Sequence, residues 1–179
     1  MGDSTARLMT VEEFRQLPET GPFYYELRHG ELVQVTRPKK RHSDVQRGLR
    51  RLLEGLAGAA GIVDTEWAFR ALPEYELRVA DVAFVSKDRW QQCDDNDNLR
   101  GAPELVFEVL SPSNTATEII DKEKLCLENS CLEFWVVDPV KRLVKVSTPD
   151  GLTKTYQERQ DIPLGLFPGT LAVSSIFME

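Results

Sequence analysis

The sequence predicts an α+β domain in which a mixed central β-sheet is flanked by helices. Short segments with alternating or continuous apolar patterns lie between turn residues, as expected for strands. Two longer segments carry apolar residues at helical spacing. These segments follow the order hairpin, helix, three strands, helix, strand and hairpin. Residues 1–179 are expected to form a single domain, because this length suits one hydrophobic core.

The first elements are a short helix and a hairpin. Residues 10–19 predict the helix, with Thr10 as N-cap and Glu13 completing a capping box. Residues 23–35 contain two alternating runs on either side of Gly30. Because glycine readily takes a positive φ, a tight turn there predicts a hairpin.

A long helix is predicted over residues 42–61, and Gly61 marks its end. Arginines lie largely outside its apolar stripe. The residues of that stripe are Val45, Leu49, Leu52, Leu53 and Leu56.

Strands are predicted next at residues 62–69, 75–79 and 79–86, followed by an acidic loop, "DDNDN". The next strand, residues 104–110, is apolar on both sides apart from one acid, which predicts burial of both faces. Side chains alternate along a strand. One face therefore holds Val106, Glu108 and Leu110, and the other holds Leu105, Phe107 and Val109.

The C-terminal half continues with a helix within residues 111–129, where Thr115 and Glu118 form a second capping box. Residues 133–139 predict a strand that ends at Asp-Pro. Residues 142–156 predict a hairpin over Pro-Asp-Gly. The tail is expected to be an edge strand or loop that packs back on the body.

Composition excludes several classes of protein. Hydrophobic residues make up 41% and charged residues 28%, as in ordinary globular proteins. No apolar run approaches the roughly 18 residues of a membrane helix, and no secretory signal is recognisable, so we expect a cytoplasmic protein without membrane contact. The three cysteines lack CxxC spacing, which suggests neither a zinc site nor a disulfide framework. A net charge of −7 argues against a general nucleic-acid coat protein but not against an enzyme with a local basic patch.

Asp81 and Glu108 are single acids on apolar strand faces. Burying an ionised carboxylate is unfavourable unless it is paired or binds a cation, and two bare carboxylates would repel each other. A magnesium ion would resolve both problems, because it typically binds one or two carboxylates and leaves room for water and phosphate. Alternatively, each acid meets an arginine or a backbone amide at a strand end.

Lys122 is the third residue of interest. At about 100° per residue it falls on the flank of the apolar stripe of its helix, whereas Lys124 lies on the polar side. Lys122 should therefore lean toward the sheet that carries Glu108, where it can balance acids and phosphate or position an attacking water. The alternative is an ordinary i,i+4 pair with Glu118.

Several motifs together carry a family resemblance. They are "MTVEEFRQLP", "YYELRHGELVQV", "ADVAFVS", "GAPELVFEVLSPSN", "EIIDKEK" and "EFWVVDP". In this order they resemble the Uma-type "putative restriction endonuclease" family, a branch of the PD-(D/E)XK nuclease superfamily. The resemblance implies a restriction-endonuclease-like fold and a Mg²⁺ or Mn²⁺ site with Asp81 and Glu108 as ligands. The superfamily lysine would stand at Leu110; in this family it is moved to the following helix and matches Lys122.

The resemblance also points to Glu26, Glu31 and His42 as accessory residues. His42, near a helix start, can contact phosphate or serve as a surface cap. Glu26 can be a third acid near the metal or pair with an arginine such as Arg28 or Arg70. Ala80 stands where the family usually has proline, which affects backbone shape and not chemistry.

The function implied is a Mg²⁺-dependent endonuclease that hydrolyses phosphodiester bonds of DNA, acting as a homodimer by analogy with the superfamily. A basic segment that includes Arg37, Lys39, Lys40 and Arg41 would hold the DNA backbone, although it can equally be an ordinary solvated charge run. One alternative is a catalytically silent nucleic-acid-binding or interaction module that keeps the nuclease fold. Another is a metal-dependent hydrolase of a small phosphate ester.

Overall fold

The structure, a computed structural model, describes residues 7–18 and 24–178. At its centre is a seven-stranded mixed sheet in the order β5-β3-β4-β6-β7-β8-β9. The pairs β3–β5 and β6–β7 are parallel, and the other neighbouring pairs are antiparallel. The strands are β3 (Gly61–Arg70), β4 (Arg78–Ser86), β5 (Leu99–Arg100), β6 (Leu105–Val109), β7 (Glu133–Asp138), β8 (Leu143–Ser147) and β9 (Thr153–Gln157).

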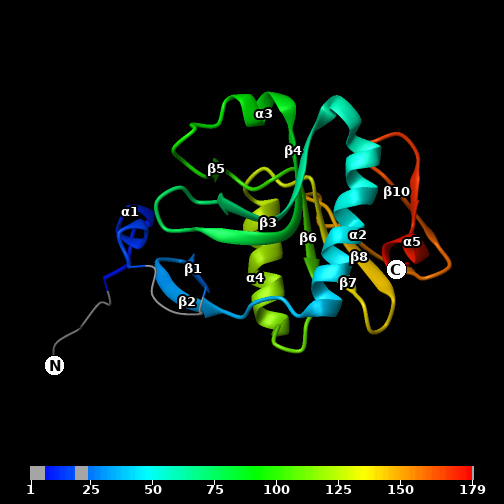
Figure 1. Cartoon of the computed structure of the whole chain (residues 1–179), viewed down its shortest axis with the longest axis horizontal. Coiled ribbons are helices and arrows are strands. Elements are labelled where there is room, and N and C mark those ends of the chain that lie inside the picture. Colours follow the sequence, from blue (N-terminus) through cyan, green and yellow to red (C-terminus); the bar gives the residue numbers. More distant parts are fainter. Residues whose placement is uncertain (1–6, 19–23, 179) are drawn as a thin grey trace.

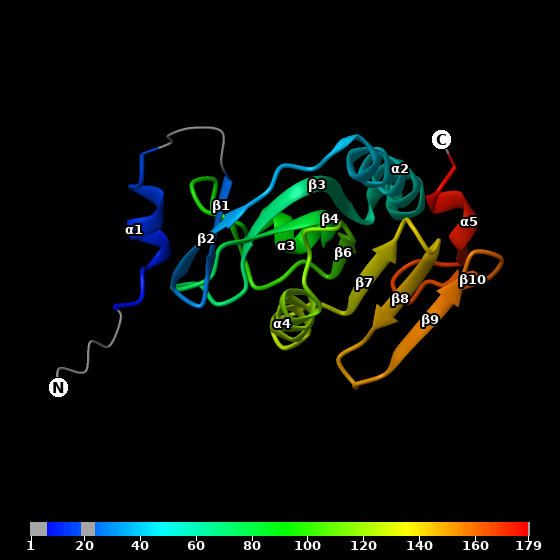
Figure 2. The same cartoon turned by 90° about the horizontal axis from the view of Figure 1, so that it is seen from below.

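Two helices cover opposite faces of this sheet, which confirms the predicted α+β class (Figures 1 and 2). Helix α2 (Lys40–Ala57) packs its Leu49 and Leu53 on one face, and α4 (Ala116–Leu127) packs Ile119 and Leu125 on the other. Strands β10 (Asp161–Pro163) and β11 (Thr170–Ala172) and helix α5 (Val173–Ile176) close the α2 side. Among the described residues, no helix is both long and apolar enough to cross a membrane.

Strand β6 is buried along its whole length. Leu105, Phe107 and Val109 belong to the core on the α2 side, whereas Val106 belongs to the core on the α4 side. This is the alternation that the sequence predicts, and it turns Glu108 toward the α4 side of the sheet.

The N-terminal elements are α1 (Val11–Arg15) and the hairpin formed by β1 (Tyr24–Arg28) and β2 (Glu31–Val35). The predicted capping box of α1 is present. The hairpin turns at His29 and Gly30, which have φ values of 50° and 74°. The predicted ends of these elements at residues 19 and 23 lie outside the described residues.

Some boundaries differ from the sequence predictions. Helix α2 begins at Lys40 and ends at Ala57, and a 3-10 turn, Gly58–Ala60, follows it. Residues 75–77 form a turn and one isolated bridge rather than a separate strand. Helix α3 (Lys87–Gln91) and strand β5 were not predicted, because both are too short to show a period.

Candidate metal and catalytic site

The site lies where β4 and β6 separate. Backbone pairing between these strands ends at Val82 and Phe107, and the next positions in register are Asp81 and Glu108. There, Oδ2 of Asp81 accepts the backbone N–H of Val109 at 2.6 Å. Side chains therefore occupy the gap in which strand pairing stops.

Lys122 enters the same gap from α4. Its Nζ lies 2.6 Å from Oε1 of Glu108 and donates to the carbonyl oxygen of Val79, also at 2.6 Å. Both charged side chains are only 9% exposed. The alternative pair between Lys122 and Glu118 is not formed, because Glu118 accepts from Arg28 at 2.7 Å. The structure thus brings Asp81, Glu108 and Lys122 together.

Burial dominates the electrostatics of this pair. It raises the pKa of Glu108 to about 8; the charge of Lys122 opposes this change and that of Asp81 adds to it. Burial would lower the pKa of Lys122, but the charges of Glu108, Glu26 and Asp81 outweigh it and leave that pKa raised. Burial thus favours the protonated form of Glu108, and a cation bound beside it would favour the ionised form.

Helix α2 and strand β3 add residues on the other side of Asp81. Nε2 of His42 lies 3.0 Å from Oδ1 of Asp81, and Nε2 of Gln46 donates to the same oxygen at 3.1 Å. Gln46 also donates to Oε1 of Glu66. One ligand atom each from His42, Glu66 and Asp81 lie within 4.8 Å of one another.

Glu66 has an unusual backbone conformation. It stands opposite Asp81 in the register of β3 and β4, with a φ of 52° in an otherwise regular pairing. A left-handed conformation is unfavourable by about 1–2 kcal/mol for residues with a side chain. Such strain is typical of functional positions, and here it accompanies a carboxylate placed beside Asp81.

The same neighbours shift two further pKa values. Glu66 is exposed, but partial desolvation of its carboxylate by the neighbouring residues raises its pKa; Gln46 opposes the rise and the Asp81 charge adds to it. Burial would lower the pKa of His42, but its hydrogen bond to Asp81 and the charges of Asp81, Glu66 and Glu108 raise it overall. Carboxylates on β3, β4 and β6 therefore shift the pKa values of their neighbours in the site.

The residues present fit a divalent cation. The cluster is rich in carboxylate oxygens, which Mg²⁺ and Mn²⁺ prefer, and His42 adds an imidazole, a common ligand of transition metals. Nδ1 of His42 is buried without a hydrogen-bond partner. The other ring nitrogen, Nε2, is the one that faces Asp81.

The remaining predicted residues divide into two groups. Glu26 is buried and accepts from Val79 N–H at 2.9 Å and from Arg28 at 2.8 Å, so the arginine pairing is the alternative that the structure shows. Arg70, the other suggested partner, pairs with Asp97. Glu31 lies exposed at the start of β2, and no described contact joins it to the site.

The predicted basic residues are only partly available to a ligand. Lys39 and Arg41 are exposed. Lys40 pairs with Asp44 at 2.7 Å, and Arg41 donates to the carbonyl oxygen of Pro139.

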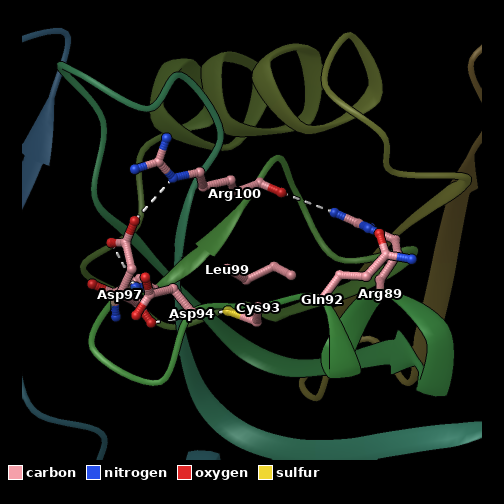
Figure 3. A pocket seen from close by; sticks show the side chains of 8 residues that line it. Arg89, Gln92, Cys93, Asp94, Asp97, Leu99 and Arg100 are labelled. Atoms are coloured by element: carbon pink, nitrogen blue, oxygen red, sulfur yellow. Dashed lines mark hydrogen bonds and ion pairs between the residues drawn. The ribbon is translucent and has the colours of Figure 1, made fainter.

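A pocket of about 320 Å³ shares no lining residue with the site (Figure 3). Within it, Asp97 accepts hydrogen bonds from Arg100 at 2.9 Å and from the neighbouring Arg70 at 2.8 Å. Burial would raise the pKa of Asp97, but these arginines and Arg15 lower it strongly. The pocket is lined by Arg89, Gln92, Cys93, Asp94, Asp97, Asn98, Leu99 and Arg100.

Sequence reasoning did not identify Gln46 or Glu66. Gln46 is buried in the structure. Its position among the apolar residues of α2 was its only signal in the sequence. Glu66 had none, because an acid at an outward position of a strand looks the same whether it faces water or a site.

Comparisons with known proteins identify the family of the chain and a solved structure with a similar fold. The Uma2 family model, described as "Putative restriction endonuclease", matches residues 11–174. A similar solved structure is the 1.96 Å crystal structure of "a putative nuclease belonging to DUF820" from Anabaena variabilis ATCC 29413. It is 22% identical with a TM-score of 0.80, and the match covers 94% of this chain and 97% of that chain, which shows a common fold. No curated protein matches this chain.

Proposed function

Because this chain belongs to the Uma2 family, described as "Putative restriction endonuclease", we propose that it is a metal-dependent endonuclease that hydrolyses phosphodiester bonds of DNA. The observation that carries this proposal is the buried contact between Lys122 and Glu108 beside Asp81. These residues supply acids for a cation and a fixed positive charge for a phosphate.

Asp81 and Glu108 are the proposed ligands of Mg²⁺ or Mn²⁺, and His42 and Glu66 supply further donor atoms next to Asp81. When bound, such a cation would polarise a phosphate oxygen and lower the pKa of a water molecule. Asp81 is held for this task by Val109 N–H, which fixes the direction of its carboxylate.

Lys122 acts as a hydrogen-bond donor and positive charge rather than as a base, because its pKa is raised and it keeps its proton. The carbonyl of Val79 and the carboxylate of Glu108 fix the position of its ammonium. A fixed cation of this kind stabilises the negative charge that develops on phosphate and can orient the attacking water.

Further parts of the proposal concern the surroundings of the site. Lys39, Lys40 and Arg41 contact the DNA backbone. To do so, Lys40 and Arg41 exchange their partners Asp44 and Pro139 for phosphate.

The protein acts in the cytoplasm as a homodimer, since two sites suit the cutting of two strands. Sedimentation equilibrium tests the dimer.

Cleavage assays test the activity. The wild type is incubated with supercoiled and single-stranded DNA and Mg²⁺ or Mn²⁺, beside Asp81→Ala and Lys122→Ala. Lys124→Ala, an exposed lysine of the same helix, is the matched control and should cleave normally. Cleavage that survives in both site variants contradicts the assignment. Absence of cleavage with every substrate and metal favours the silent binding module.

A further inference from the structure

The β1–β2 hairpin and the segment after it carry an aromatic and basic surface. Tyr24 is 50% exposed, and the guanidinium carbon of Arg37 lies 4.2 Å from the centre of its ring. Lys39 follows and is exposed. We call Tyr24, Arg37 and Lys39 the hairpin surface. This basic surface contrasts with the chain as a whole, which has a net charge of −7.

The hairpin surface adjoins the proposed catalytic site along the chain. Tyr24 and Glu26 lie on the same face of β1, about 7 Å apart along a strand. Glu26 in turn holds the backbone N–H of Val79, whose carbonyl oxygen binds Lys122.

A second set of contacts connects the segment after the hairpin to the elements of the site. Oγ1 of Thr36, next to Arg37, lies 3.3 Å from Oγ of Ser113, in the turn that follows the strand of Glu108. Lys39 directly precedes α2, the helix that brings His42 to Asp81. The hairpin surface is therefore connected to segments that carry Glu108 and His42.

An exposed tyrosine with a basic neighbour fits a nucleic acid strand whose bases are unpaired. Aromatic rings stack on the face of any base, and basic groups hold the phosphates between bases. In a duplex, neighbouring base pairs cover these faces. Resting on the proposed function, we propose that the hairpin surface binds single-stranded DNA, with one unpaired base stacked on the face of the Tyr24 ring opposite Arg37, and that this strand is the preferred substrate of the site.

Fluorescence anisotropy of a labelled oligonucleotide, single-stranded or annealed to its complement, tests this inference. EDTA is present, so that binding is measured apart from cleavage. The wild type should bind the single strand more tightly than the duplex. Tyr24→Ala should weaken single-strand binding by about fivefold or more, and Tyr24→Phe should retain it. Tyr75→Ala removes another tyrosine, 37% exposed, and should change nothing.

Salt dependence separates the contribution of charge from that of stacking. For single strands, each lost phosphate contact reduces the slope of log affinity against log salt concentration by about 0.7. Lys39→Ala should show this reduction, whereas Tyr24→Ala should keep the wild-type slope. Lys87→Ala, an exposed lysine at the start of α3, is the charge control.

The outcomes distinguish this inference from the proposed function. Duplex binding as tight as single-strand binding, no binding by the wild type, or unchanged binding by Tyr24→Ala would overturn the inference, even if DNA is cleaved. Specific single-strand binding without cleavage under any metal would support binding at the hairpin surface, but it would overturn the statement that this strand is the substrate and count against the endonuclease activity.

Discussion

Oδ2 of Asp81 accepts the backbone N–H of Val109 at 2.6 Å, so a side chain of β4 satisfies a backbone group of β6 where the two strands part. The sequence left two interpretations of Asp81 open, a metal ligand and a partner for a strand-end amide. The geometry shows the second and is compatible with the first, since the remaining oxygen faces His42. One carboxylate can therefore serve both the fold and the site.

This double role predicts different results for two substitutions of Asp81. Asp81→Asn keeps an acceptor for Val109 N–H, whereas Asp81→Ala leaves that buried donor unsatisfied, at about 1–3 kcal/mol. We expect Asp81→Asn to be more stable than Asp81→Ala by this amount, with Mn²⁺ binding reduced in both. Urea denaturation and calorimetric titration measure the two effects. Equal stability of the variants would show that the hydrogen bond contributes little.

Removing one charge of the buried pair Lys122–Glu108 should reduce stability more than replacing both charges. Above a pH of about 8, where Glu108 is ionised, Lys122→Met removes its counter-ion and leaves the Val79 carbonyl without its donor, so unfolding free energy should fall by about 3–5 kcal/mol. The double variant Lys122→Met with Glu108→Leu removes both charges and should recover much of that loss. Urea denaturation provides the values, with Lys124→Met as the control. A double variant no more stable than Lys122→Met would contradict this explanation.

The pKa of Glu108 predicts how stability depends on pH in the absence of metal. That pKa is raised from 4.5 to about 8, so the folded protein binds more protons than the unfolded chain between these values. The stability contributed by protonated Glu108 is therefore present at low pH and lost as pH rises toward about 8. Relative to Glu108→Gln, the wild type should become less stable over this range. Denaturation in EDTA at several pH values measures the difference, and a constant or rising difference would contradict the prediction.

The left-handed backbone of Glu66 predicts that glycine is tolerated there better than alanine. Both substitutions remove the carboxylate and its hydrogen bond from Gln46, but only alanine keeps a Cβ at a φ of 52°. Glu66→Gly should be more stable than Glu66→Ala by about 1 kcal/mol. Thermal or urea unfolding checks the order, and the reverse order would place the strain elsewhere. If Glu66 binds the metal, both variants should also have weakened Mn²⁺ affinity.

Much of the frame of the site could be predicted from the residue pattern. Strand β6 is short and apolar on both sides, so Glu108 stood out, and the apolar stripe of α4 predicted that Lys122 turns toward the sheet. Glu66 could not be found in this way. Its place depends on one positive φ and on pairing with β4, and neither leaves a period in the sequence.

Lys122 stands on a helix and not on the strand of Glu108, and this has a consequence for biosynthesis. A chain emerges from the ribosome N-terminus first, so the acids at positions 26, 66, 81 and 108 are made before the ammonium at position 122. The complete charge arrangement requires β4, β6 and α4 together. A chain that has not yet reached residue 122 thus lacks the group that we assign to phosphate, whatever strands it has formed.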